Sequence, residues 1–152
     1  MNTKPLVLIA ENDEDSLWRF SRWITELGCQ VVVAASGGEL LSRMAPEKPD
    51  LVILDLGGSG ADGLGFCRLL KSSINFGKVP LVAVAGELDF GMRERARRAG
   101  ADAVLVKPVS QLEMINQARR LLGMVDDGRL AEKITELEKR VWTRASRASG
   151  GG

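Results

Sequence analysis

The chain has 152 residues, 45% of them hydrophobic and 27% charged, which suits one globular domain plus an appendage and argues against a disordered chain or a disulfide scaffold. Lys and Arg number 21 against 20 Asp and Glu, so the net charge of +1 does not indicate a nucleic-acid-binding protein. Because the chain has no His, His general bases and imidazole zinc sites are excluded. Two cysteines without a CxxC motif, and no apolar run long enough for a signal or a membrane span, predict a cytoplasmic protein.

Five short runs rich in Val, Ile and Leu recur along the chain. None alternates with polar residues, which is typical of strands that are covered on both faces of a parallel sheet. The runs are Leu6–Ala10, Val31–Ala35, Leu51–Leu54, Leu81–Ala85 and Ala103–Val106.

Helical patterns separate these runs. The expected helices are Ser16–Leu27, Glu39–Met44 before Pro46, Leu64–Lys71, Phe90–Ala99 and a helix from Ser110 to about Leu122. Gly28 suits the end of the first, and Ser110 with Glu113 forms a capping box for the last. The alternation of strand and helix predicts an α/β fold, a doubly wound, flavodoxin-like sheet of order 2-1-3-4-5 with right-handed crossovers.

A helical extension is expected after this domain, so we divide the chain into a domain over 1–123, a helix over 124–147 and a flexible tail over 148–152. Apolar residues in the extension are spaced four, three and four apart, as in a coiled coil. They are Leu130, Ile134, Leu137 and Val141. The helix either packs back on its own domain or joins two copies of the chain, and a homodimer through this seam is the favoured outcome.

The residues that follow the strands carry the chemistry, because ligands bind at the carboxyl edge of such sheets. Glu11, Asn12 and Asp13 follow the first strand, Asp55 follows the third, and Lys107 follows the fifth. Hard oxygen ligands with a nearby ammonium group suit Mg²⁺ and a phosphoryl group.

This pattern resembles the receiver domain of two-component response regulators over about Pro5–Leu122. The resemblance rests on acidic residues after the first strand and on four motifs in the same order. These are Pro49–Leu56, Gly60–Gly63, Val79–Val84 and Gly100–Pro108.

The resemblance implies a role for each matching residue. Asp55 would accept a phosphoryl group from a histidine kinase or a phosphotransfer protein, and Lys107 would contact the phosphoryl oxygens. Glu11, Asn12, Asp55 and the backbone carbonyl of Gly57 would hold Mg²⁺. Asp13 is an alternative metal ligand if the register shifts by one residue. The implied protein is a signalling module, not an enzyme beyond its own phosphorylation, and it acts through contacts with other proteins.

Three residues depart from the family pattern. Asn12 stands where the family has a metal-binding Asp, Ala85 where it has a Ser or Thr hydroxyl, and Val104 where it has an aromatic ring. Two other hypotheses therefore stay open. One is a pseudo-receiver that acts as an interaction or dimerisation module without phosphorylation. The other is an unrelated flavodoxin-like enzyme or cofactor-binding protein, which would need a phosphate- or flavin-binding loop.

Overall fold

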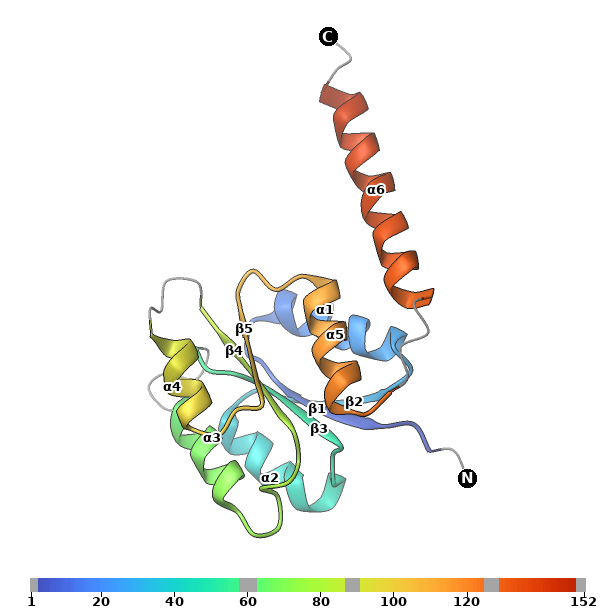
Figure 1. The fold of residues 1–152 in the computed structure, drawn as a ribbon. Coiled ribbons are helices and arrows are strands. Elements are labelled where there is room, and N and C mark those ends of the chain that lie inside the picture. The colour runs from blue at the N-terminus through green and yellow to red at the C-terminus, as the bar shows by residue number, and fades with distance from the viewer. Residues whose placement is uncertain (1–2, 58–62, 87–90, 125–128, 150–152) are drawn as a thin grey trace.

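Parallel strands form the centre of the protein, which we describe from a computed structural model (Figure 1). The structure describes residues 3–57, 63–86, 91–124 and 129–149. The strands are β1 (Leu6–Ala10), β2 (Gln30–Ala34), β3 (Leu51–Asp55), β4 (Leu81–Ala85) and β5 (Ala103–Val106). All pairings are parallel and the sheet order is β2-β1-β3-β4-β5. The predicted fold class and strand order are therefore confirmed.

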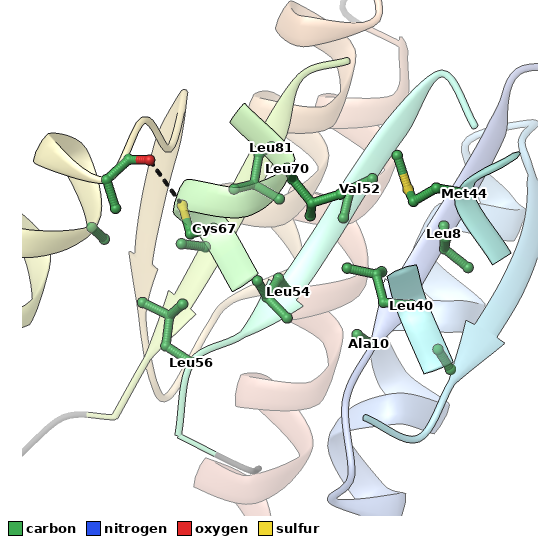
Figure 2. Close-up of a cluster of buried hydrophobic side chains, with 14 residues drawn as sticks. Leu8, Ala10, Leu40, Met44, Val52, Leu54, Leu56, Cys67, Leu70 and Leu81 are labelled. Atoms are coloured by element: carbon green, nitrogen blue, oxygen red, sulfur yellow. Dashed lines mark hydrogen bonds between the residues drawn. The ribbon is translucent and has the colours of Figure 1, made fainter. Parts of the chain in front are cut away.

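Helices cover both faces of the sheet. They are α1 (Glu14–Glu26), α2 (Gly37–Glu47), α3 (Gly63–Ser72), α4 (Met92–Arg98), α5 (Gln111–Leu121) and α6 (Arg129–Ser149). Buried side chains of α2, α3 and α4 pack together on one face of the sheet, and those of α1 and α5 on the other. Figure 2 shows the first of these clusters, in which the Cys67 thiol donates to the carbonyl oxygen of Ala99 at 3.6 Å.

Capping residues explain where several helices begin and end. The predicted capping box is confirmed: Glu113 N–H donates to Ser110 Oγ at 3.1 Å, and Ser110 N–H donates to Glu113 Oε2 at 3.0 Å. Gly28 follows the end of α1 with φ of +102°, a conformation that glycine adopts without steric cost.

Helix α1 begins at Glu14, two residues ahead of the expected Ser16, because Asp13 is its N-cap. Helices α2 and α4 also differ from the prediction. Helix α2 begins at Gly37, ahead of the expected Glu39, because Ser36 Oγ accepts the Glu39 N–H at 3.1 Å and caps the helix. It also continues past Pro46, which lies inside its last turn, and ends one residue later. Helix α4 begins at Met92, and the expected start at Phe90 lies outside the described residues.

The C-terminal extension is helical over Arg129–Ser149, so Ala148 and Ser149 belong to α6 and not to a tail. Met124, where the helix was expected to begin, is not helical. Helix α6 contacts α5 and then extends away from the sheet (Figure 1). Among the described residues, no helix combines the length and the apolar character that a membrane crossing requires.

Candidate functional site

Three charged side chains meet at the carboxyl edge of the sheet. Glu11 follows β1, Asp55 ends β3 and Lys107 follows β5. The Lys107 Nζ lies 3.3 Å from Glu11 Oε1 and 3.3 Å from Asp55 Oδ2. Because parallel strands end at one edge, residues far apart in sequence share this site, as the sequence predicted.

Burial sets the electrostatics of the two carboxyl groups. Glu11 is 2% exposed and Asp55 6% exposed, while the Lys107 side chain is partly open to solvent. Burial, followed by the adjacent Asp55 carboxylate, raises the pKa of Glu11 to about 7. Burial lowers the pKa of Lys107, but the charges of Asp55 and Glu11 outweigh it, so this pKa lies above its ordinary value. The ammonium group is therefore charged and only partly offsets two neighbouring acids.

The raised pKa of Glu11 predicts a pH dependence of stability in the metal-free protein. A carboxyl group whose pKa is higher in the folded state stabilises the fold below its ordinary value of 4.5, and this contribution is lost as pH rises through about 7. Glu11→Gln cannot ionise. We therefore expect the free energy of unfolding of the wild type, relative to this variant, to fall by on the order of 2–3 kcal/mol between pH 5 and pH 8.

Urea denaturation in EDTA at several pH values measures this difference. Glu39→Gln is the matched control, because hydrogen bonds from Ala35 N–H and Arg43 lower the pKa of Glu39 and keep it ionised across this range. A difference between the wild type and Glu11→Gln that stays flat from pH 5 to pH 8 would contradict the assignment.

Backbone contacts fix the Asp55 side chain. Its Oδ1 accepts the Gly57 N–H at 3.1 Å, and its Oδ2 faces Lys107. The next residue, Leu56, donates its N–H to Val84 O at 2.8 Å and so continues the sheet. Gly63 at the start of α3 approaches so closely that a Cβ there would lie 2.6 Å from the Leu56 backbone. The backbone of Leu56 is thus held between β4 and the start of α3.

Asp13 and Asn12 are adjacent in sequence but have different surroundings in the structure. Asp13 is the N-cap of α1, and its Oδ2 accepts from Ser16 N–H at 3.0 Å and from Ser16 Oγ at 2.7 Å. These bonds from Ser16 lower the pKa of Asp13. Asn12 is exposed and lines a small cavity beside Glu11 and Asp55. Asp13 therefore caps helix α1 through the carboxylate oxygen that a metal ion would need.

The residues present fit a magnesium ion. Glu11 Oε2 is buried and has no hydrogen-bond partner among the described residues. The cavity beside it has a volume of about 10 Å³, which is about the space of one water-sized group. No three His, Cys, Asp or Glu side chains converge on a metal position in the described part of the chain. The unpartnered Glu11 Oε2 and the cavity beside it would therefore suit a small cation that takes oxygen ligands.

The sequence did not lead us to predict that residues following β2 line this cavity. Ala35, Ser36 and Gly37 line it together with Glu11 and Asp55. The predicted strand order could have found them, because it places the second strand beside the first, and its carboxyl end at the same edge.

Two departures from the family pattern lie on β4 and β5. Ala85 ends β4, is buried, and accepts the Lys107 N–H through its carbonyl oxygen at 2.9 Å. Val104 on β5 packs against the cluster that contains α3 and α4. Neither side chain carries a polar group, so neither can form a hydrogen bond to a new oxygen at the site.

A parallel sheet with paired acids and a lysine at its carboxyl edge defines the class of protein. The family model of the response regulator receiver domain matches residues 7–119, so the chain belongs to that family. This family is a signalling module and not a classical enzyme, and receiver domains interact with histidine kinases or phosphotransfer proteins.

Curated relatives agree with this assignment. The transcriptional regulatory protein PrrA of Mycobacterium tuberculosis is 30% identical over 79% of this chain and 51% of its own length. The polar-differentiation response regulator DivK of Brucella ovis is 29% identical over 77% of this chain and 95% of its own length. The chain thus spans about half the length of the transcriptional regulators it matches and nearly all of DivK.

Solved structures share the fold. A putative response regulator from Chloroflexus aurantiacus superposes with a TM-score of 0.75 at 24% identity, covering 80% of this chain and 99% of that one. The receiver domain of a histidine kinase from Syntrophus aciditrophicus gives a TM-score of 0.72 at 25% identity, with 78% and 90% covered. Receiver domains of this shape therefore occur both in response regulators and in kinases.

Proposed function

We propose that Asp55 accepts a phosphoryl group from a histidine kinase or a phosphotransfer protein, and that the chain then signals through protein contacts. The observation that carries this proposal is the 3.3 Å contact between Asp55 Oδ2 and the Lys107 ammonium at the open edge of the sheet. The only chemistry proposed for the chain is its own phosphorylation. The proposal includes a cytoplasmic site of action, which suits the two buried free cysteines, Cys29 and Cys67.

In the proposed step, an Asp55 carboxylate oxygen attacks the phosphorus of a phosphohistidine. The new P–O bond forms as the P–N bond breaks, and the electron pair of that bond returns to the imidazole nitrogen, which takes up a proton. The product is an acyl phosphate on Asp55. Lys107 would contact the transferred oxygens and partly offset their charge beside Glu11.

Glu11, Asn12, Asp55 and the Gly57 carbonyl would hold Mg²⁺ in this proposal. Asp13 is left out of the set because Ser16 engages its Oδ2. A bound magnesium ion supplies positive charge that neutralises the transferring phosphoryl group. Because Asn12 brings an uncharged oxygen where an Asp would bring a charged one, we expect this chain to bind the metal weakly.

Acetyl phosphate labelling followed by intact mass tests the proposal. With Mg²⁺ in excess we expect the wild type to gain the mass of one phosphoryl group and Asp55→Asn to gain none. Asn12→Asp restores a charged ligand, so it should tighten Mg²⁺ binding and speed labelling by about tenfold. No mass gain in the wild type at saturating donor and Mg²⁺ would overturn the proposal.

A second candidate function is favoured by the same three departures. Asn12 brings no charge to the proposed metal site, and Ala85 and Val104 have no polar side chain. Phosphorylation would therefore create few contacts that stabilise one conformation of the domain over another. A modification without such differential contacts shifts populations little. If the labelling experiment fails, a phosphorylation-independent pseudo-receiver that acts as an interaction or dimerisation module replaces the first proposal.

We propose that the chain forms homodimers through helix α6. Leu137 and Val141 are 47% and 68% exposed and lie on the same side of the helix, four residues apart. Ile134, expected in the same seam, is only 2% exposed, so it already packs within the chain. The proposed interface therefore starts beyond Ile134, while the side chain of Leu130 lies outside the described residues.

Charge placed in this seam should separate the dimer. We expect Leu137→Glu combined with Val141→Glu to convert a dimer into a monomer in multi-angle light scattering, because each glutamate would be desolvated at the interface. Lys139→Glu changes the net charge by the same amount on the opposite side of α6, and should stay dimeric. A wild type that remains monomeric at high concentration would rule out this interface.

A further inference from the structure

A groove lies at the amino-terminal edge of the sheet, opposite the edge that carries Asp55 and Lys107. It forms where the end of α2 and the residues before β3 meet the segment between α3 and β4. Because β3 and β4 are neighbours in the sheet, the residues that precede them lie side by side. The groove has a volume of about 460 Å³, within the range of about 300–1,000 Å³ that is typical of small-molecule sites. Its lining residues are Ala45, Lys48, Pro49, Asn75, Phe76 and Val79.

Apolar side chains form most of the wall of this groove. Phe76 and Val79 are half-buried and pack against the core cluster of α2 and α3, and Pro49 is buried. Hydrogen bonds hold the wall in place: Phe76 N–H donates to Ser73 Oγ at 3.2 Å, and Val79 N–H donates to the Phe76 carbonyl oxygen at 3.0 Å. The fold therefore presents an aromatic ring beside aliphatic groups on an ordered surface.

Lys48 brings an uncompensated positive charge to the groove. It is exposed and forms no ion pair within the part of the chain that the structure describes. The acids nearest to it in sequence are engaged elsewhere: Glu47 Oε1 lies 3.9 Å from Arg43 Nη1, and Asp50 Oδ2 accepts a backbone N–H of β1 at 2.8 Å. Asn75, which is also exposed, adds a side-chain amide that can donate a hydrogen bond. The groove thus combines apolar walls with one cation and one amide.

We propose that this groove binds a small aromatic carboxylate. The Lys48 ammonium group would pair with the carboxylate, and the Asn75 amide would donate a hydrogen bond to it. The aromatic body would lie against Phe76, because aromatic rings favour offset or edge-to-face contact with one another. The groove lies away from Asp55, so the proposal does not rest on phosphorylation and is tested on the unmodified protein.

Other occupants match this lining less well. Lys48 is the one charged residue among the described residues that line the groove, and a ligand with several phosphates would need more cations than that. A second protein chain typically contacts about 20–30 residues on each side of an interface, and the groove offers six. A ligand with one negative charge and one aromatic body matches both the size and the chemistry of the groove.

Amide chemical shifts of the full, isotope-labelled chain test the proposal. The probe is naphthaleneacetate, and its neutral analogue naphthaleneethanol carries a hydroxyl group in place of the carboxylate. We expect naphthaleneacetate to cause saturable shifts at Asn75, Phe76 and Val79, with a Kd below about 1 mM. The neutral analogue should shift the same signals with a Kd about fivefold higher, because it cannot pair with Lys48.

Two lysine variants locate the charge that the carboxylate recognises. Lys48→Met keeps most of the aliphatic chain but removes the ammonium group, so it should bind naphthaleneacetate about fivefold more weakly and the neutral analogue like the wild type. Lys78→Met is the matched control, because it removes another exposed lysine from the segment between α3 and β4 that does not line the groove. It should bind both probes like the wild type.

Each other outcome counts against the proposal. It is wrong if the wild type shows no saturable shifts at Asn75, Phe76 and Val79, if the two probes bind equally, or if both lysine variants lose the same affinity for naphthaleneacetate. The same shifts appearing at high protein concentration without a probe would assign the groove to a contact between copies of the chain instead. Both variants change exposed side chains and should melt with the wild type, so a loss of binding is not a loss of fold.

Discussion

Ile53→Ala should lower the free energy of unfolding by about 2–5 kcal/mol. Ile53 is 1% exposed and lies in β3, the middle strand of the sheet, where both faces are covered by helices. Truncation to Ala leaves a cavity between β3 and the side chains of α1 and α5 that pack on it. The cavity cannot close, because pairing with β1 and β4 fixes the backbone of β3. Urea denaturation monitored by tryptophan fluorescence measures the loss.

Ile74→Ala is the matched control for this prediction. It makes the same chemical change at a residue that is fully exposed in the segment between α3 and β4. Exposed substitutions of this kind change stability by within about 0.5 kcal/mol. If the two variants lose equal stability, the burial assigned to β3 is wrong.

Lys107→Met should slow the labelling of Asp55 by acetyl phosphate by about 100-fold. Methionine keeps much of the aliphatic chain but removes the ammonium group that lies 3.3 Å from both Asp55 Oδ2 and Glu11 Oε1. The transferring phosphoryl group then adds negative charge beside two buried acids without a protein cation to offset it. Initial rates of mass gain at fixed Mg²⁺ measure the effect.

Lys71→Met separates this effect from the general loss of an ion pair. Lys71 is also partly buried and pairs with Asp102 at 3.0 Å, but it lies away from the site. We expect this control to label at the rate of the wild type even if it is less stable. Equal slowing in both variants would show that Lys107 acts through the fold and not on the phosphoryl group.

Strand positions could be predicted closely from the sequence because the sheet is covered on both faces. Such strands must be apolar throughout, and the runs at Leu6–Ala10, Leu81–Ala85 and Ala103–Val106 match β1, β4 and β5. The second strand is displaced by one residue, to Gln30–Ala34, because it lies at the edge of the sheet. An edge strand can begin with an exposed polar residue such as Gln30, which an apolar pattern excludes.

Helix ends were harder to predict because side chains outside the apolar pattern decide them. The start of α2 depends on Ser36, whose hydroxyl caps a turn that begins with two glycines. In α6 the seam residues look equivalent in sequence, yet Ile134 is buried and Val141 is exposed. Which seam residue is buried depends on how α6 meets the rest of the chain, and spacing within one helix carries no information about that.

The site itself was only partly predictable. The order of motifs placed Asp55 and Lys107 together, and the structure brings them within 3.3 Å. The second contact of Lys107, to Glu11, and the raised pKa of Glu11 depend on burial, which the sequence does not give.

The proposal that Asp55 carries the phosphoryl group is tested most directly by locating the modified residue. Borohydride reduces an aspartyl phosphate to an alcohol and releases phosphate, so a phosphorylated aspartate becomes homoserine. After labelling with acetyl phosphate and Mg²⁺, reduction and proteolysis, mass spectrometry of the peptides should find homoserine at position 55 and Asp at positions 13, 50 and 102. Homoserine at another position, or at none, would contradict the account.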